Sequence, residues 1–265
     1  MMRWKTGLFA ILCAVVWVGG LAVLSAEEDG GEQPLELPSV EEVNAHLDEL
    51  YRADSSKAQM TMTIVTDRRG TRELELEAWT RGDDDALFVI RSPARESGTA
   101  TLRTEDGLWN YAPRADRLVR VPTGMLSDSW MGSHLTNDDL VRETGYDEDY
   151  EVELEWGQAD GQRVLVANMT PKPGAPVVYS QVVYTLDAEH WTPLSAEFFD
   201  GDRVVRRMEF SDVRSVGERQ VPHKMVVQPQ DKPGESTTLQ YRALEFGVDI
   251  DESIFTRRGL RRIAR

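Results

Sequence analysis

The side chains best suited to acid–base chemistry are four histidines, and they are scattered along the chain. They are His46, His134, His190 and His223, and no two are close in sequence. The HExxH, GxSxG, GxGxxG and P-loop patterns, which mark metal, nucleophile or phosphate sites, are absent from the sequence. The histidines therefore indicate no catalytic or metal-binding site.

Three acidic clusters could bind calcium, but none has the spacing of a calcium-binding loop. They lie at residues 83–85, 147–149 and 249–252, and none matches the D-x-[DN]-x-[DN]-G pattern. In a chain with 46 acidic residues such clusters arise by chance, usually in solvated loops. We expect no metal and no cofactor. Two carboxylates that meet in space and act as general acid and base, as in a hydrolase, remain an alternative.

The net charge and the hydrophobic content of the chain limit the kinds of molecule that it can bind and the kinds of structure that it can form. The chain has 265 residues, of which 30 are Lys or Arg and 46 are Asp or Glu, so its formal charge is −16. Binding to phosphates needs clustered Lys and Arg, so the charge argues against nucleic acid, and it also disfavours an anionic membrane surface. Hydrophobic residues make up 40% of the chain, which is enough for a core and too much for a disordered protein.

The first 26 residues have the layout of a secretory signal peptide. Arg3 and Lys5 precede an apolar, uncharged run over residues 8–24, and an acidic stretch follows Ala26. Because the apolar run is long, retention as an uncleaved membrane anchor is the alternative. Cleavage would remove Cys13, the one cysteine in the sequence, and would exclude disulfides.

A leader and a single domain are expected after the signal peptide. Residues 27–38 are acidic and contain Gly and Pro, which is typical of a flexible leader. Residues 39–265 show no break in composition and are expected to form one domain. A helix begins it, because Ser39 and Glu42 form a capping-box pair and apolar residues follow at three- and four-residue steps as far as Tyr51.

A period of two then replaces the helical period. Met60, Met62 and Ile64 alternate with threonines, and Leu74 and Leu76 alternate with glutamates after an Asp-Arg-Arg-Gly turn. This pattern predicts a β-hairpin with one apolar face. A curved sheet with such a face must pack on something or enclose something.

Further strand-like runs follow at short intervals. They are residues 86–91, 99–103, 108–111, 117–121, 150–156, 163–169, 177–186, 194–199, 203–210, 223–228 and 237–246. Roughly a dozen short antiparallel strands are typical of a sandwich or barrel, and not of a βαβ sheet. A second helical signal interrupts them, with Thr136 as N-cap and Asp138 and Asp139 in the first turn.

Residues 98–141 are the most distinctive segment. Trp109, Tyr111 and Trp130 form a dense group of aromatics, although core packing explains most aromatics on hairpins. Arg117 and Arg120 could hold a carboxylate or phosphate head group. Trp130 and Met131 stand in a loop beside a glycine, where large apolar side chains often mark a binding mouth or lid.

This segment resembles the outer-membrane lipoprotein-sorting protein family, whose members have a LolA/LolB-like fold. The matching residues are Gly98–Arg103, Trp109, Tyr111, Pro113, Arg117, Arg120, Pro122, Ser129–Ser133 and Thr136–Val141. The departures are Val121 for isoleucine, His134 for an acidic residue and Leu135 for phenylalanine. The similarity extends over roughly residues 37–262.

The resemblance implies a mainly β, α+β fold. We expect a half-open antiparallel β-barrel of 11 or 12 strands around a hydrophobic cavity, with an N-terminal helix and a short helical lid. It also implies a non-catalytic, monomeric periplasmic carrier that moves an acylated lipoprotein or lipid towards the outer membrane. Its partners would be an inner-membrane transporter or permease and an outer-membrane acceptor. Methionines suit such a cavity, because their side chains adapt to flexible acyl chains.

The expected cavity and lid residues combine the hairpin face with the distinctive segment. They are Met60, Met62, Ile64, Leu74, Leu76, Trp109, Tyr111, Arg117, Arg120, Trp130 and Met131. An interaction module of a membrane transporter is the alternative, in which Trp130 and Met131 would form the contact and the barrel would be only a scaffold.

Overall fold

A computed structural model describes residues 36–51, 53–141, 149–175 and 177–264. The predicted signal peptide, most of the predicted leader and most of the acidic cluster at 147–149 lie outside the described residues. Leu37–Arg265 form one compact unit. None of the helices in the described ranges is long and apolar enough to span a membrane.

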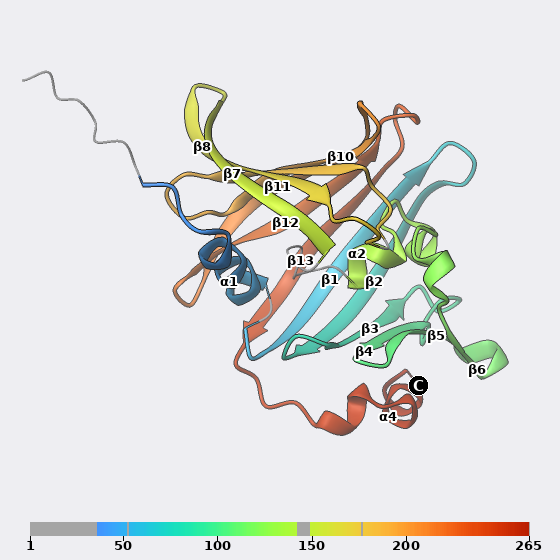
Figure 1. Cartoon of the computed structure of the whole chain (residues 1–265). Helices are drawn as coiled ribbons and strands as arrows, with labels where there is room; N and C mark the ends of the chain where they lie inside the picture. The colour runs from blue at the N-terminus through green and yellow to red at the C-terminus, as the bar shows by residue number, and fades with distance from the viewer. Residues whose placement is uncertain (1–35, 52, 142–148, 176, 265) are drawn as a thin grey trace, which may run out of the picture. The chain divides into compact units, whose positions relative to one another are not determined.

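One antiparallel sheet of 13 strands makes up most of the protein (Figure 1). The strands are β1 (Ser55–Thr66), β2 (Gly70–Arg81), β3 (Asp85–Ser92), β4 (Ala100–Thr104), β5 (Gly107–Ala112), β6 (Arg117–Arg120), β7 (Tyr150–Ala159), β8 (Gln162–Pro171), β9 (Gln181–Asp187), β10 (Pro193–Asp200), β11 (Arg203–Val216), β12 (Arg219–Pro229) and β13 (Ser236–Phe246). The mainly β, half-open barrel is confirmed. Every predicted run overlaps one of these strands, although residues 177–180 precede β9 and 11 or 12 strands were expected.

The sheet consists of two meanders that meet at its centre. Strands β1 to β6 run in sequence to one edge, β13 to β7 run in reverse to the other, and β1 pairs with β13 between them. Because β6 and β7 are opposite edges, the connection between them must cross the open side of the sheet. Its described part, residues 121–141, carries the short helices η2 (Thr123–Met125), η3 (Trp130–Gly132) and α2 (Asn137–Val141).

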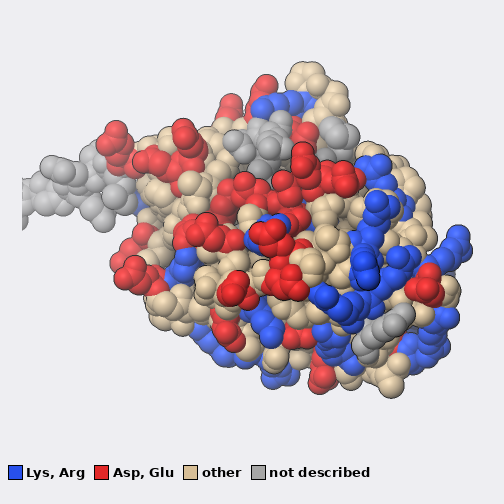
Figure 2. All heavy atoms as spheres, turned by 90° about the horizontal axis from the view of Figure 1, so that it is seen from below, with Lys and Arg blue, Asp and Glu red and all other residues tan. Residues whose placement is uncertain are grey.

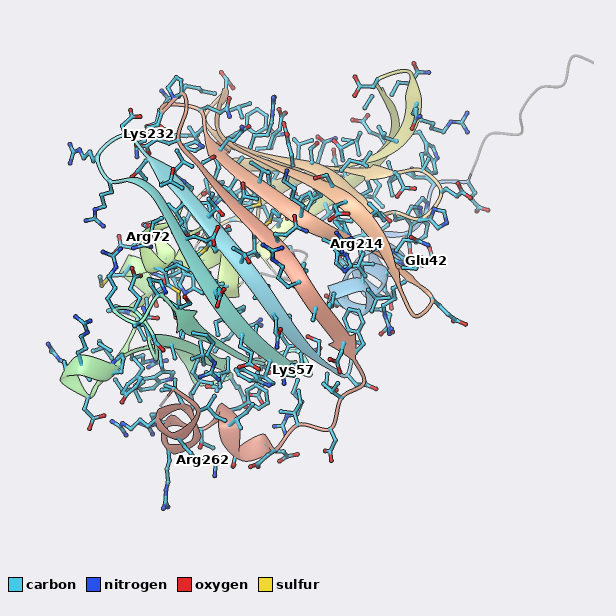
Figure 3. All side chains as sticks on the ribbon, turned by 180° about the vertical axis from the view of Figure 1, so that it is seen from behind. Glu42, Lys57, Arg72, Arg214, Lys232 and Arg262 are labelled. Atoms are coloured by element: carbon cyan, nitrogen blue, oxygen red, sulfur yellow. The ribbon has the colours of Figure 1, made fainter. Side chains whose placement is uncertain are left out.

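Both faces of the sheet carry apolar side chains, so the protein has two main cores. The inner core lies on the concave face and includes the hairpin residues Met60, Met62, Ile64, Leu74 and Leu76. The outer core lies on the opposite face of β2 to β6, where η4 (Glu252–Phe255) and α4 (Arg257–Ile263) pack. Elsewhere the outer face carries polar side chains, among them Lys57 and Arg214 (Figure 3).

Helix α1 (Val40–Tyr51) begins as the sequence predicts. The Ser39 backbone N–H donates to the Glu42 carboxylate at 2.8 Å, and the Glu42 N–H donates to Ser39 Oγ at 3.2 Å. These reciprocal bonds satisfy two amides that the first turn leaves unpaired. The second helical signal is also confirmed, because Thr136 and Asp139 make the same pair of bonds at the start of α2, at 2.7 and 3.2 Å.

Candidate functional site

An apolar cavity of about 180 Å³ lies between the concave face of the sheet, α1 and the connection that contains α2. Its wall includes four of the nine methionines in the chain, and they come from strands far apart in the sequence. These are Met60 of β1, Met169 of β8, Met208 of β11 and Met225 of β12. Flexible thioether side chains can change the shape of a cavity at little cost.

Helix α1 covers part of the cavity with its apolar stripe. Val40, Val43 and Leu47 face inward, as residues three and four apart on one helical face must. Asn44 lies on the same face, and its side-chain Nδ2 is buried without a hydrogen-bond partner in the described structure. A buried amide donor without a partner is costly, so a ligand with a carbonyl acceptor would be favoured here.

The Trp-Met-Gly segment closes another part of the cavity. Trp130 is only 3% exposed, and its indole Nε1 donates to Thr101 Oγ1 at 3.0 Å. Its ring meets Phe88 edge to face, with centroids 5.4 Å apart. Met131 and Gly132 both have positive φ, 52° and 71°, and this tight turn directs the Trp130 side chain inward. Trp130 is therefore a wall of the cavity and not an exposed loop side chain.

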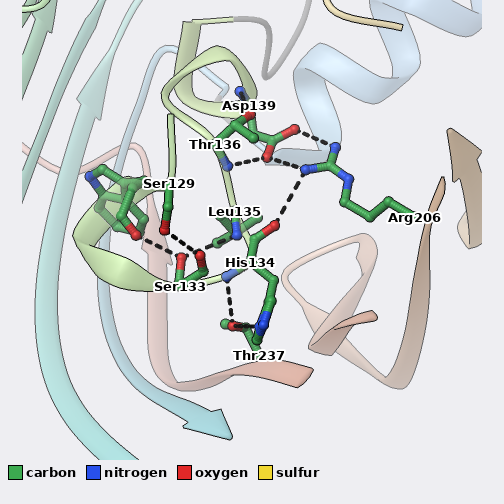
Figure 4. Close-up of polar contacts among 9 residues, drawn as sticks. Ser129, Ser133, His134, Leu135, Thr136, Asp139, Arg206 and Thr237 are labelled. Atoms are coloured by element: carbon green, nitrogen blue, oxygen red, sulfur yellow. Dashed lines mark hydrogen bonds and ion pairs between the residues drawn. The ribbon is translucent and has the colours of Figure 1, made fainter. Parts of the chain in front are cut away.

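A buried ion pair ties the connection to the sheet (Figure 4). Arg206 of β11 donates to both oxygens of Asp139 at 2.6 and 2.7 Å, and Arg206 is 5% exposed. Its guanidinium also lies over the rings of Phe198, at 3.9 Å, and Tyr179, at 4.9 Å. Burial in this cluster raises the pKa of the Tyr179 hydroxyl well above its usual range. The pair fixes α2 against β11 at the cavity wall.

His134 provides a second tie between the connection and the sheet. Its backbone N–H donates to Thr237 Oγ1 at 3.0 Å, and its ring nitrogens lie 2.9 Å from Thr237 Oγ1 and 3.1 Å from the Glu235 carboxylate (Figure 4 shows the Thr237 contacts). The bond from His134 is the main cause that lowers the pKa of Glu235. The substitution of histidine for the acidic residue of the family pattern thus creates a pairing with β13.

The expected site residues fall into three groups. Met60 and Trp130 line the cavity, whereas Met62, Ile64, Leu74 and Leu76 are buried in the inner core beneath it. Met131 is half-buried against that core, and its carbonyl accepts a hydrogen bond from Arg72.

The third group does not lie at the cavity. Tyr111 belongs to the outer core, and Trp109 packs against that core, because alternate residues of β5 point to the outer face. Arg117 and Arg120 are exposed on the edge strand β6. The structure therefore does not bring these four residues to the apolar site.

Arg206 and Asp139 were missed as site residues, although the sequence carries a signal for Arg206. On β11, Met208 and Phe210 alternate with Arg207 and Glu209, and Arg206 occupies the preceding position of that apolar row. A charge on the apolar face of a strand is rarely buried without a partner. The partner itself lies 67 residues away, and local pattern does not reveal it.

No cluster of three or more His, Cys, Asp or Glu side chains that could hold a metal occurs among the described residues. None of the described residues that line the cavity is a histidine, and its acidic residues are Asp48 and Asp139. Asp139 is engaged by Arg206. The cavity is thus built for contact with apolar groups, with polar groups at its α1 and α2 sides.

Solved structures with the same fold include proteins from three bacteria. An outer membrane lipoprotein-sorting protein domain from Vibrio parahaemolyticus is 24% identical, with a TM-score of 0.73, and the match covers 83% of this chain and 96% of that one. A DUF1329 family protein from Desulfovibrio piger is 22% identical, with a TM-score of 0.75 and the same coverage. A LolA superfamily protein from Nitrosomonas europaea is 20% identical, with a TM-score of 0.70 over 83% of this chain and 99% of that one.

A family model described as "uncharacterized protein" matches residues 82–262, and no curated protein matches the sequence. The matched range covers most of the sheet, all of η4 and all but the last residue of α4. The similarity to lipoprotein-sorting proteins inferred from residues 98–141 is confirmed at the level of the fold. The chain therefore belongs to the family described as uncharacterized protein, and its fold is that of the LolA superfamily and of outer membrane lipoprotein-sorting domains.

Proposed function

We propose that this protein is a periplasmic carrier that holds the acyl part of a lipoprotein or lipid in its apolar cavity and moves it towards the outer membrane. The observation that carries the proposal is the methionine-rich cavity under α1. The lipoprotein-sorting domain among the structures with the same fold supports this class of cargo. The signal peptide expected over residues 1–26 supports export.

The size of the cavity sets a scale for the ligand. A dry apolar cavity of roughly 150 Å³ takes up benzene, so about 180 Å³ accommodates a short stretch of acyl chain without rearrangement. Each buried methylene contributes about 0.8 kcal/mol, which is about a fourfold gain in affinity. Six methylenes would contribute roughly 5 kcal/mol before the costs of association. Longer chains require the methionines or α1 to move.

The carrier works without catalysis in this proposal. The described cavity wall offers no histidine, and one of its two carboxylates is held by Arg206. The alternative of a transporter interaction module used Trp130 and Met131 as the contact, but Trp130 is buried and Met131 is half-buried. An acyl carrier uses Trp130 as cavity wall and therefore accounts for its position.

Two measurements test the carrier. Native mass spectrometry of the full-length protein from its own cells should show bound acyl species, and the purified protein should take up a fluorescent fatty acid. Ala167 of β8 lines the cavity, so Ala167→Phe should lower fatty-acid uptake tenfold or more. Ala243→Phe, on the exposed face of β13, is the matched control and should change uptake less than twofold.

Protein that is empty in every preparation and does not take up the fatty acid would refute the proposal. Equal uptake by the Ala167→Phe and Ala243→Phe variants would place the ligand outside this cavity. Turnover of acyl esters that disappears on a single Asp or Glu substitution would favour a hydrolase instead.

A further inference from the structure

Positive charge gathers on one side of this acidic protein. Residues 114–120 and 257–262 hold seven of the 30 basic residues of the chain but only one of its 46 acidic residues. We call this surface the basic face; its arginines are Arg114, Arg117, Arg120, Arg257, Arg258, Arg261 and Arg262. Seen from the side of α4, Lys and Arg side chains concentrate on one half of the molecule and Asp and Glu on the other (Figure 2).

The fold brings the two arginine-rich segments together. Leu260 of α4 is buried in the outer core, so the arginines around it point outward. The Arg257 guanidinium lies 4.9 Å from the Trp109 ring centroid on β5, and Arg261 lies 3.5 Å from Asp116 in the turn before β6. Arg262 lies at the outer rim of α4, at the opposite end of the molecule from Lys232 (Figure 3).

Several of these arginines have no anionic partner in the part of the chain that the structure describes. Arg114, Arg117 and Arg258 make no ion pair or side-chain hydrogen bond with the described residues, whereas most arginines elsewhere on the sheet do. Arg207 pairs with Glu197, for example, and Arg214 with Asp212. Guanidinium groups match phosphate oxygens in a two-point geometry. Unpaired arginines on one face are therefore available for external anions.

Two exposed apolar side chains lie close in sequence to the arginines of residues 114–120. Val119 of β6 is 47% exposed and Met125 of η2 is 49% exposed, and both rank among the few large apolar side chains on the surface. Val119 stands between Arg117 and Arg120 on the edge strand, and it alternates with Leu118, which packs on the outer core. Arginines next to exposed apolar groups are typical of surfaces that bind at the lipid–water interface, where the apolar tip enters and the charges meet head groups.

We propose that the basic face binds the surface of a bilayer that carries anionic phospholipid head groups. The net charge of −16 disfavours an anionic surface only over a short range, because the Debye length at physiological ionic strength is about 8 Å. Acidic residues also precede α4, and one of them, Asp251, lies 3.2 Å from Arg262. The membrane therefore interacts with the local excess of arginine and not with the total charge.

Binding of the basic face to a bilayer does not depend on which cargo the cavity holds. Binding of vesicles to the basic face and uptake of a fatty acid by the cavity are separate measurements, and either can fail without the other. An acidic protein surface would also attract the arginines. It would not by itself account for the exposed Val119 and Met125, so the bilayer is favoured.

Co-sedimentation of full-length protein with vesicles tests the proposal. Vesicles with 30% phosphatidylglycerol in phosphatidylcholine are compared with pure phosphatidylcholine, which accounts for any binding by the apolar N-terminal run. Each arginine near an anionic surface changes partitioning by roughly fivefold at low salt. Arg117→Gln together with Arg258→Gln should thus lower binding to the anionic vesicles by about 25-fold, and raised salt should weaken binding of the unchanged protein.

Arg68→Gln together with Arg69→Gln is the matched control. Both residues are exposed in the β1–β2 turn, at the far end of the sheet from α4, and the charge removed is the same. This variant should bind within about twofold of the unchanged protein. Equal losses in the two double variants, or equal binding to neutral and anionic vesicles, would overturn the proposal. Capture by immobilised polyglutamate at least as tight as by anionic vesicles would also overturn it, in favour of an acidic protein.

Discussion

Removing one partner of the Arg206–Asp139 pair should lower the stability of the protein strongly, and substitution tests this. In Asp139→Asn, the Arg206 guanidinium stays at a site that is 5% exposed but loses its counter-charge. Arginine cannot escape by losing its proton. Breaking a buried ion pair in this way typically costs 3–5 kcal/mol. The rings of Phe198 and Tyr179 retain part of the stabilisation, so we expect about 3 kcal/mol.

Urea unfolding measures this cost directly, and the double variant isolates its cause. For a domain of this size, about 3 kcal/mol corresponds to a Tm lower by roughly 6–12 °C. Arg206→Met with Asp139→Leu removes both charges, and it should recover most of the loss because a buried pair can be replaced by apolar residues of similar volume. The reasoning is wrong if Asp139→Asn costs under 1 kcal/mol, or if the double variant loses the sum of the two single losses.

Three further substitutions have clear expected outcomes. Trp130→Ala should destabilise the protein by about 3–5 kcal/mol in urea unfolding, because it removes a buried indole from the cavity wall. Gly98 has a φ of +81°, and a Cβ there would lie 2.4 Å from the Ala264 carbonyl oxygen. Gly98→Ala should therefore weaken the packing of α4, and hydrogen exchange should show faster exchange of the α4 amides. The bond from His134 lowers the pKa of Glu235 in the folded protein below its ordinary value of 4.5. Ionised Glu235 should therefore stabilise the fold at pH values above 4.5, and this contribution should be lost as the pH falls through the lowered pKa. The Tm difference between unchanged protein and Glu235→Gln, followed from pH 7 down to pH 3, would then shrink on acidification; a difference that stays constant would contradict this role.

Alternation in the sequence revealed the strands but not which face each residue would occupy. Met60 and Trp109 both stand on amphipathic strands, yet Met60 reaches the cavity and Trp109 packs on the outer core. A period of two separates the two faces of a strand and leaves open which of them is concave. Because α4 covers part of the outer face, both faces are apolar there, and the usual contrast between core and solvent disappears.

Long-range pairings explain the other omissions. Asp139 was recognised only as a charge in a first helical turn, and its contact with Arg206 depends on how the connection crosses the sheet. Helix α4 carries four arginines in seven residues, and its few apolar residues give little periodic signal. The helix is held instead by contacts of Leu260 and Ala264 with strands over 150 residues earlier in the chain.

The pairing of the first strand with the last has a consequence for how the protein is made. Each meander can form from hairpins between neighbouring strands. The pairing of β1 with β13 joins residues roughly 170–190 positions apart, so it carries the largest entropic cost of loop closure. If the chain is exported as proposed, it emerges from its N-terminal end, so one edge of β1 stays unpaired until almost the whole sequence has crossed the membrane. That edge is a template for aggregation. A holding chaperone in the destination compartment would therefore be needed mainly during this interval.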